Sequence, residues 1–510
     1  MSESSGSEEE ARGGGDLVDR VGADPGGVSD PGAPTSAELH RGVLLGISGL
    51  FVATFVSMLS STIVTNALPR ITEDLGAGQA TYTWVVTSTL LAQTAATPLW
   101  GKLADLTDPR RLVSLSVAVF LAGSVAAALA PDAGVLIAGR TLQGVGAGGV
   151  MILTQVVMAR IVPARERGRY NGWFGAVFAL ATVIGPLVGG LLVDAGGLGW
   201  RWCFWIGVPF AALALVVVER TLRVPVRERE IRIDYAGAAL LVGGITDLLV
   251  WVSLGGQEFA WGSLWTALLV PAGIVMLALA AVVESRAAEP VVPLGLFRDR
   301  TMVMASLASV FYGSALYAVT VFLAPYFQIA RGVSPVMSGL LSFPLILSMA
   351  AASMLVGRWI SRTGRWKPYL VGAAASLVAG LLLLATVRVT TPYALLAVAM
   401  VLCGFGTGAT MQNLVLAVQN SVAPKDTGSA SATVTFLRSL GGAVGISALG
   451  AVLTARRHAA THGPGPAAAA AGYSSGVALV FGISAAAALA GALLILAVRE
   501  KPLATEIVDQ

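Results

Sequence analysis

Arg140 is the one charged residue in the apolar run 134–158. A charged guanidinium in such a run indicates a chemical role. A buried guanidinium is costly unless it faces a polar interior and finds partners there. If the run is a helix, Gln143 and Gln155 lie on compatible faces of it as polar partners. Arg140 is therefore a candidate functional residue. The alternative is a structural role, in which Arg140 only bonds backbone carbonyls of a neighbouring helix.

Asp247 is the second candidate, because it is the one carboxylate placed deep within an apolar run, near the middle of 235–255. A carboxylate held away from water can exchange protons near neutral pH. The sequence therefore predicts a proton site at Asp247, with a neutral, hydrogen-bonded aspartic acid as the alternative.

The remaining reactive residue types argue against several classes of function. His40, His458 and His462 form no HExxH motif and no catalytic pair, and no GxxxxGK[ST] loop occurs, so an enzyme or an ATP-driven pump is not expected. Cys203 and Cys403 lie in apolar runs without CxxC spacing, which favours buried hydrophobic residues over a disulfide or a metal site. The arginines are scattered over short loops, so nucleic acid is not an expected partner. No cofactor is expected.

The elements that must position Arg140 and Asp247 are apolar. Of the 510 residues 55% are hydrophobic and 12% are charged, whereas about a quarter of the residues in a soluble domain are charged. One large soluble core is excluded, because such cores stop growing near about 250–300 residues. The apolar residues come in runs of about 20, the length that spans a bilayer as a helix. The sequence therefore predicts an all-α integral membrane protein.

Fourteen apolar runs are expected to be transmembrane helices, and a count that differs by one pair is the alternative. The runs lie near 42–66, 81–100, 111–130, 134–158, 170–193, 202–218, 235–255, 262–283, 302–327, 336–357, 369–387, 393–418, 428–453 and 474–497.

Charge placement predicts the orientation of these helices. With the N-terminus inside, the inward loops and tails hold 25 of the 33 Lys and Arg residues and the outward loops hold 6. Cytoplasmic loops retain positive charge, so both termini are expected on the cytoplasmic side of the cell membrane. Residues 1–40 are acidic and rich in Gly, Ser and Pro, which indicates a disordered cytoplasmic tail without the pattern of a signal peptide.

An internal repeat has an offset of 256 residues. The offset carries the loop at Gly101 onto the loop at Gly357, and the glycines at Gly185 onto those at Gly441. Two six-helix repeats, 41–219 and 301–498, are therefore expected to flank a segment, 220–300, that inserts helices 7 and 8, with a short cytoplasmic tail at 499–510. Parallel repeats of this kind place a substrate site at their interface near the membrane midplane.

Six short motifs occur in a fixed order. They are Thr62–Pro69, Gly101–Arg111, Arg140–Ala147, Gly185–Gly190, Trp200–Pro209 and Phe436–Gly442. Over residues 42–497 the sequence resembles the major facilitator superfamily, and specifically its branch of 14-helix drug:H+ antiporters. The resemblance implies a major-facilitator fold, in which two six-helix repeats and two inserted helices give 14 transmembrane helices.

The resemblance assigns roles to the motifs. Gly101, Asp105, Arg110 and Arg111 correspond to a cytoplasmic loop motif whose aspartate braces the inner gate; here the arginines can face anionic lipid or pair with Asp105. Asp108 and Pro109 depart from that motif. The other gating candidates are Gly185, Pro186, Gly189 and Gly190, for which helix packing alone is the alternative to gating. Arg140 is implied to take part in proton coupling.

Ser60 is the main departure from the branch. Many members carry an aspartate two residues before the threonine at Thr62, and that aspartate is implicated in recognising cations or moving protons. Ser60 and Ser61 cannot carry charge. The missing carboxylate therefore favours neutral, anionic or zwitterionic substrates over cations, and proton coupling depends on Arg140.

The expected function is efflux of a small organic substrate, a drug or secondary metabolite, by proton antiport without ATP. Uptake or uncoupled facilitation on the same fold is the alternative, because function resides in the site and not in the fold. Membrane lipid is the remaining expected partner. The candidate liners of the substrate cavity are polar or aromatic: Gln93, Gln143, Gln155, Tyr312, Tyr317, Phe405, Gln412 and Asn413.

Overall fold

The computed structural model describes residues 36–503, except 77–78, 195–198, 223, 225–233, 257, 288 and 461–465. The regular elements of this part are helices. The predicted acidic tail lies almost wholly outside the described residues, and so does most of the C-terminal tail. The described residues from Gly42 onward form one compact unit.

Each apolar run falls on one helix or on two consecutive helices and extends at most three residues beyond them. The bounds are α1 Ser36–Asp74, α2 Gln79–Leu106, α3 Pro109–Ala128, α4 Ala133–Ile161, α5 Ala164–Asp194, α6 Trp202–Trp205, α7 Gly207–Thr221, α8 Tyr235–Leu254, α9 Leu264–Arg286, α10 Arg300–Pro325, α11 Pro335–Leu341, α12 Phe343–Thr363, α13 Lys367–Leu384, α14 Tyr393–Gln419, α15 Thr427–Ala460 and α16 Pro466–Ala497. Short η1 Leu294–Arg298, η2 Tyr326–Ala330 and η3 Pro424–Asp426 join or extend them.

Aspartates set the starts of several helices. Asp108 accepts a hydrogen bond from the Arg110 backbone N–H and is followed by Pro109 at the first position of α3. Asp132 caps α4 and Asp299 caps α10 in the same manner. A side-chain oxygen at this position satisfies a backbone N–H that has no partner inside the helix. Asp108 and Pro109, which depart from the loop motif, therefore form the start of α3.

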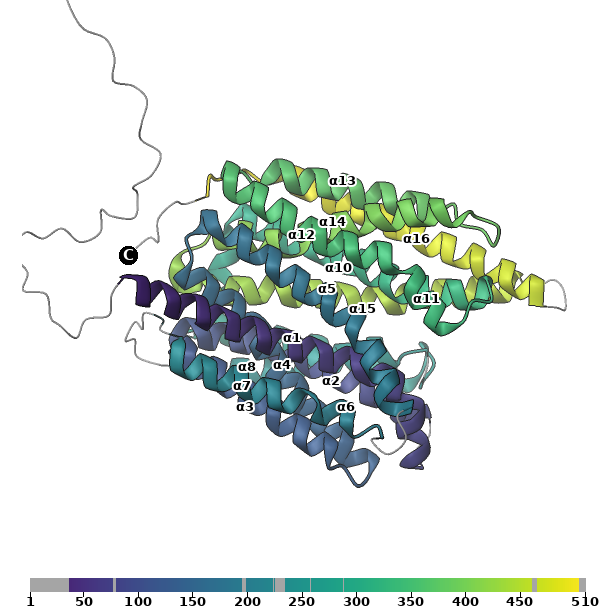
Figure 1. Cartoon of the computed structure of the whole chain (residues 1–510), viewed down its shortest axis with the longest axis horizontal. Coiled ribbons are helices and arrows are strands. Elements are labelled where there is room, and N and C mark those ends of the chain that lie inside the picture. Colours follow the sequence, from purple (N-terminus) through teal and green to yellow (C-terminus); the bar gives the residue numbers. More distant parts are fainter. Residues whose placement is uncertain are drawn as a thin grey trace, which may run out of the picture. The chain divides into compact units, whose positions relative to one another are not determined.

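The helices repeat at the offset found in the sequence. Adding 256 to Pro109–Ala128 gives 365–384, and α13 is Lys367–Leu384. The contacts repeat as well, since α4 packs against α2 and α3 while α14 packs against α12 and α13. Figure 1 shows α1–α4 and α7 on one side and α10, α12–α14 and α16 on the other. Helix α5 lies along α12 of the other group, and α15 lies along α2.

Twelve helical segments of the described residues are long and apolar enough to cross a membrane. Helices α2 and α5 are not among the twelve, although they contain 28 and 31 residues. The fold is thus all-helical with many membrane spans, and the count of fourteen remains a prediction.

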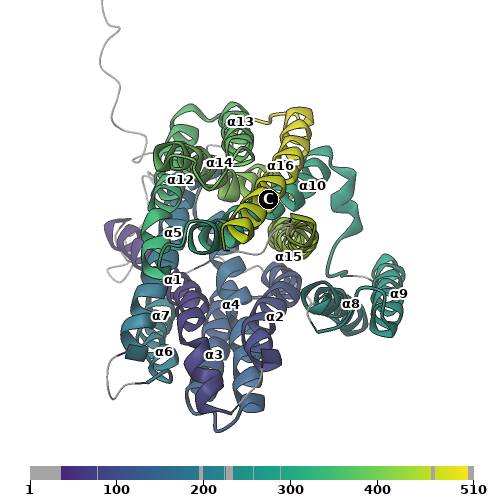
Figure 2. The ribbon, with the colours of Figure 1, turned by 90° about the vertical axis from the view of Figure 1, so that its right-hand side faces the viewer.

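The inserted pair α8 and α9 lies at the edge of the bundle (Figure 2). Ile245 and Leu249 of α8 pack in one apolar cluster with Leu91 and Ala95 of α2. Helix α8 also contacts α15, so the pair rests where the two groups of helices meet.

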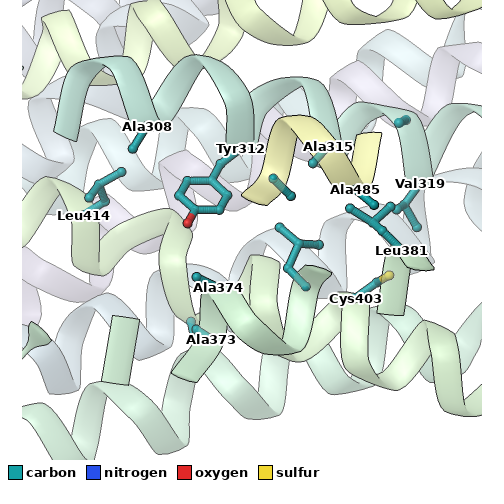
Figure 3. Packing of buried hydrophobic residues seen from close by; sticks show 14 of the residues in the cluster. Ala308, Tyr312, Ala315, Val319, Ala373, Ala374, Leu381, Cys403, Leu414 and Ala485 are labelled. Atoms are coloured by element: carbon teal, nitrogen blue, oxygen red, sulfur yellow. The ribbon is translucent and has the colours of Figure 1, made fainter. Parts of the chain in front are cut away.

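The second group encloses a hydrophobic core between α10, α13, α14 and α16 (Figure 3). Small residues let these helices approach closely, as at Gly380, where an added Cβ would lie 2.7 Å from the Cys403 backbone nitrogen. Both cysteines are free and buried, as predicted.

Candidate functional site

Arg140 lies in α4 with 2% of its surface exposed. Its Nη1 donates to Gln143 Oε1 at 2.5 Å and to the Ser60 carbonyl at 3.5 Å, and its Nε donates to the Val85 carbonyl at 3.2 Å. These oxygens come from α1, α2 and α4, so the guanidinium joins three helices. Among the described residues, no carboxylate forms an ion pair with it.

Two further contacts fix this group. Gln143 Nε2 donates to Ser124 Oγ at 2.8 Å, which orients the amide oxygen toward Arg140. The Phe204 ring centroid lies 5.9 Å from the guanidinium carbon.

Arg140 also lines a cavity of about 40 Å³ with Ser61 and Thr89, enough for a few water molecules. Gln143 therefore orients Arg140, and its place in a substrate cavity stays a prediction.

Asp105 joins the end of α2 to the start of α15. Its carboxylate accepts hydrogen bonds from the Gly428 N–H at 2.7 Å, the Ser429 N–H at 2.8 Å and Ser429 Oγ at 2.7 Å. The N-terminus of a helix carries partial positive charge and unpaired N–H groups, so it suits a carboxylate. Asp105 follows the apolar run 81–100, and desolvation raises its pKa to about 6.

The two arginines of this loop do not bond Asp105 in the described residues. Arg111 Nε lies 3.7 Å from the Asp108 carboxylate, with its side chain 89% exposed. Arg110 donates to the Glu219 carbonyl at the end of α7. The alternative in which these arginines pair with Asp105 is therefore wrong, because α15 supplies the partners of that carboxylate.

Helix α2 crosses α15 near Asp105, and α12 crosses α5 in a corresponding way. At Gly101 an added Cβ would clash with Ala432 and lie 2.7 Å from the Gly428 carbonyl, whereas at Gly357 it would clash with the Gly168 carbonyl. Ser361, which corresponds to Asp105 at the 256-residue offset, accepts a hydrogen bond from the Arg169 N–H at 3.0 Å. The end of the bundle that carries Asp105 is thus closed by two repeat-related helix crossings.

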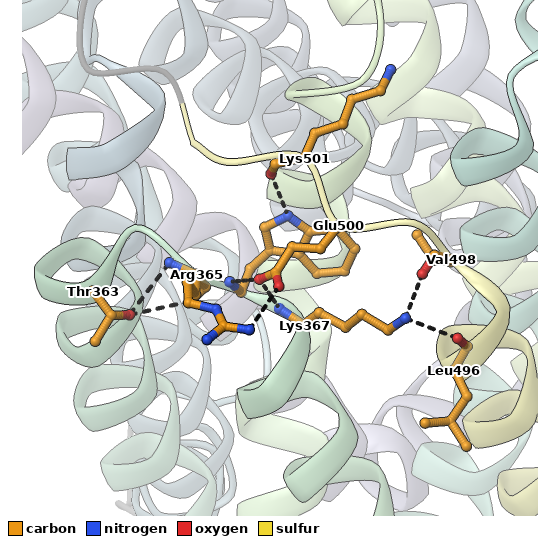
Figure 4. Close-up of polar contacts among 8 residues, drawn as sticks. Thr363, Arg365, Lys367, Leu496, Val498, Glu500 and Lys501 are labelled. Atoms are coloured by element: carbon orange, nitrogen blue, oxygen red, sulfur yellow. Dashed lines mark hydrogen bonds and ion pairs between the residues drawn. The ribbon is translucent and has the colours of Figure 1, made fainter.

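The loop after α12 corresponds to the loop after α2, and it is held within its own half (Figure 4). Glu500 accepts hydrogen bonds from the Trp366 N–H at 2.9 Å and the Lys367 N–H at 3.0 Å. Lys367 Nζ donates to the carbonyls of Leu496 and Val498. Among the described residues, the carboxylate that bonds from one half to the other at this end is that of Asp105 in α2.

The glycine motif of α5 lies against α1. An added Cβ at Gly185 would clash with Thr62 Oγ1, and one at Gly189 would clash with the Ile63 carbonyl. Thr62 Oγ1 also donates to the Ala181 carbonyl at 3.1 Å. Close approach of two backbones explains these glycines. Pro186 and Gly190 lie within α5, and their side chains fall outside the described residues.

Three predicted liners carry buried amide atoms without hydrogen-bond partners. Gln155 lacks partners for both amide atoms, Gln412 for Nε2 and Asn413 for Oδ1. Each of these side chains is at most 5% exposed. Buried polar atoms without partners are rare, so they mark places where water or a ligand would bind. Gln93 is partly exposed and its Nε2 lies 3.7 Å from Met151 Sδ.

The aromatic candidates do not lie together. Tyr312 is in the hydrophobic core of the second group of helices, between α10, α13 and α14, and its hydroxyl has no partner (Figure 3). Phe405 packs against the same core. Tyr317 lies against α15, where its ring would meet a Cβ added at Gly442.

Asp247 faces the inserted helix α9. Its Oδ2 has no hydrogen-bond partner and would lie 2.8 Å from a Cβ added at Gly273. Ile245 and Leu249, on the opposite side of α8, contact the rest of the bundle. The structure therefore does not bring Asp247 together with Arg140.

Two charged contacts were not predicted from the sequence. Lys102 Nζ bonds Glu289 Oε2 at 2.7 Å, with the side chains 8% and 16% exposed. Arg438 of α15 donates from Nη1 to the Met411 carbonyl at 2.8 Å. The position of Arg438 inside an apolar run could have revealed it, whereas the partner of Lys102 lies 187 residues away and has no signal in the sequence.

Residues 50–446 match the family model described as Major Facilitator Superfamily. The "Multidrug transporter protein MdtP" of Bacillus subtilis is 35% identical over 80% of this chain and 75% of its own length. "Efflux pump dotC" of Dothistroma septosporum is 32% identical over 82% of this chain and 72% of its own.

A solved structure has the same fold. The proton:xylose symporter XylE bound to 6-bromo-6-deoxy-D-glucose aligns with a TM-score of 0.65 at 14% identity, covering 91% of this chain and 98% of its own. Likeness at that identity shows the arrangement of helices alone.

Proposed function

The chain belongs to the major facilitator superfamily, and we propose that it is a secondary exporter of drugs or secondary metabolites that works by proton antiport. Its family and its relatives are those of non-enzymatic membrane transporters. Export is supported by the relatives that are named a multidrug transporter and an efflux pump.

In such an exporter the two halves open the substrate site to one side of the membrane at a time. The observation that supports this alternating access is the pair of helix crossings at one end of the bundle. Helices α2 and α15, and α5 and α12, come from different repeats and meet at glycines. Contacts of this kind can separate when the halves rock. With the N-terminus inside, this end is cytoplasmic, so the conformation is closed to the cytoplasm. We place the protein in the cell membrane with both termini in the cytoplasm.

We further propose fourteen spans, made up of two six-helix halves and the pair α8–α9. Helices α2 and α5 contain 28 and 31 residues, and at about 1.5 Å per residue either can cross a bilayer about 30 Å thick. Both pack against helices of the other half, and Ser88, Thr89 and Thr97 of α2 are buried in the protein. Their polarity therefore agrees with a central position.

Arg140 is the proposed coupling residue. Its guanidinium is buried, lines a small cavity and has neutral partners, so a change in the water or charge near it alters its energy strongly. Asp247 is a weaker candidate, because it faces α9 and not the interface between the halves.

Inverted membrane vesicles test this function. A panel of drugs is offered with and without an imposed pH gradient, using wild type, Arg140→Ala and Arg140→Lys. We expect gradient-dependent accumulation by wild type and its loss in Arg140→Ala at normal abundance. Accumulation that ignores the gradient would exclude antiport. Low abundance of Arg140→Ala would assign the residue a structural role, and movement only in the opposite direction would favour uptake.

A further inference from the structure

The helices that meet across the two halves carry an unbalanced charge. These are α2, α4, α5, α12, α14 and α15. Their apolar runs contain two charged residues, Arg140 and Arg438, and no aspartate or glutamate. Ser60 stands where a carboxylate would be expected by resemblance. The interior between the halves is therefore positive, with one guanidinium from each half.

Arg438 lies near the middle of α15, with 7% of its surface exposed. Its one hydrogen bond among the described residues is from Nη1 to the Met411 carbonyl, and a guanidinium has five N–H donors. Tyr317 is close enough to interact with it electrostatically. No carboxylate of the described residues forms an ion pair with Arg438. A carbonyl holds the group in place without neutralising its charge.

Two further buried hydrogen-bond donors lack partners, one in α15 and one in α14 beside Met411, the residue whose carbonyl Arg438 bonds. Thr435 precedes Arg438 by three residues, so its hydroxyl lies on the same face of α15, where it is buried without a partner. Gln412 follows Met411 directly, and its buried Nε2 has no acceptor. The hydroxyl can donate, and the guanidinium and amide N–H groups can only donate. Such a set suits a group that offers several lone pairs and a negative charge.

Electrostatics then favours one class of substrate. A buried unpaired charge is costly, and a carboxylate or sulfonate would offset that cost through charge-assisted hydrogen bonds to the guanidinium. A cation would instead approach two guanidiniums, and the apolar runs of these helices contain no carboxylate to compensate. We propose that this protein transports an organic anion, and that Arg438 recognises its negative group. The proposal rests on the proposed export function and specifies its substrate.

The test uses two dyes that share a xanthene core and differ in charge, fluorescein as the anion and rhodamine 123 as the cation. Fluorescence polarisation with the purified full chain measures binding. We expect fluorescein to bind more tightly, and Arg438→Gln to weaken it by about tenfold or more while sparing rhodamine 123. Arg438→Lys should recover part of the loss.

Arg331→Gln is the matched control, because it removes a similar bond, from Nη1 to the Thr391 carbonyl at 2.7 Å, outside the region between the halves. It should leave the binding of both dyes unchanged. The proposal is overturned if rhodamine 123 binds at least as tightly as fluorescein, if fluorescein does not bind, or if Arg438→Gln weakens both dyes equally.

A transport assay in vesicles distinguishes failure of the export function from failure of the preference for an anion. Gradient-driven movement of rhodamine 123 without fluorescein would retain export and exclude the anion. Failure of every compound to move would contradict export, whereas the binding comparison would still decide whether the site prefers an anion.

Discussion

Asp105 combines strong local bonding with a cost of burial. In the closed conformation its carboxylate accepts three hydrogen bonds from α15, yet desolvation raises its pKa from 3.8 to about 6. Opening of this end would expose the group to water and restore an ordinary pKa. A proton is then bound more tightly in the closed state. The closed state is therefore favoured most below about pH 4, and this advantage is lost as the pH rises through 6.

We expect the end of the bundle that carries Asp105 to open more readily at pH 7.5 than at pH 5. Ser353 of α12 is 2% exposed and donates to the Asn171 carbonyl of α5, so Ser353→Cys reports separation of that crossing. Its rate of labelling by an impermeant maleimide in inverted vesicles is divided by the rate for the SDS-denatured protein at the same pH, which removes the pH dependence of the thiol itself. This normalised rate should rise with pH. Asp105→Asn should abolish the rise. An equal rise in Asp105→Asn would contradict this role.

Sequence could identify the charged residues but not their partners. Arg140 was recognisable because a lone charge in an apolar run needs partners, and Gln143 at the next turn of the helix is one of them. The Ser60 and Val85 carbonyls are not recognisable, because every residue has a carbonyl and only packing selects one. Tyr312 was misleading for a related reason, since its hydroxyl does not reveal that the ring lies in a core.

At the scale of elements, glycines at helix crossings serve two purposes that mutation can separate. Gly101 lies between α2 and α15, which belong to different halves, whereas Gly146 lies between α4 and α3 of one half. An added side chain at Gly101 can be accommodated if the halves separate. At Gly146 it would clash with the Phe120 backbone nitrogen, and no movement of the halves relieves that clash.

Gly101→Val should therefore raise labelling of Ser353→Cys at normal abundance. Gly146→Val should lower abundance and destabilise the fold by about 1–3 kcal/mol, as overpacking does, without raising labelling of the protein that remains. Thermal unfolding of the purified variants measures the second effect. Equal loss of stability in both variants would mean that the α2–α15 crossing is a fixed part of the fold.

The ion pair of Lys102 and Glu289 links the inserted helices to the gate. Glu289 lies in the linker between α9 and α10, and the far end of that linker belongs to the second half, where Asp299 caps α10 and lies 3.5 Å from Lys501. Lys102 is three residues before Asp105. A cavity of about 450 Å³, lined by Lys102, Glu289 and Lys425 among others, leaves room for the linker to move.

Removal of one partner should open this end. Lys102→Met and Glu289→Gln each remove this ion pair between two largely buried side chains, so each should weaken the closed state and raise labelling of Ser353→Cys. The exchange Lys102→Glu with Glu289→Lys should restore the wild-type rate. If the exchanged protein labels as fast as the single variants, the pair does not hold the gate.

Some elements were predictable and others were not. The apolar runs and the 256-residue offset predicted the paired helices, because length, hydropathy and glycine spacing are local or periodic signals. The linker after α9 has no such signal. Its contact with Lys102 depends on how the inserted pair rests against α2 and α15, and that is decided by the shapes of Ile245, Leu249 and their neighbours.

At the scale of the whole molecule, the number of spans is determined by α2 and α5. If either failed to cross, every later loop would change sides, and the bias of Lys and Arg toward one side would be lost. The structure offers a reason for their weaker apolar character, since both helices pack against helices of the other half. Central helices need fewer apolar residues than lipid-facing ones.

We therefore expect the ends of each helix on opposite sides of the membrane. Single cysteines replace Glu73 or Arg111 for α2, and Glu166 or Arg201 for α5, in a background where both buried native cysteines are alanine. An impermeant maleimide should label positions 73 and 201 in intact cells, and positions 111 and 166 only in inverted vesicles. Labelling of both ends of α2 or of α5 from one side would remove that helix from the count, because a helix that crosses the bilayer must present its ends to different solutions.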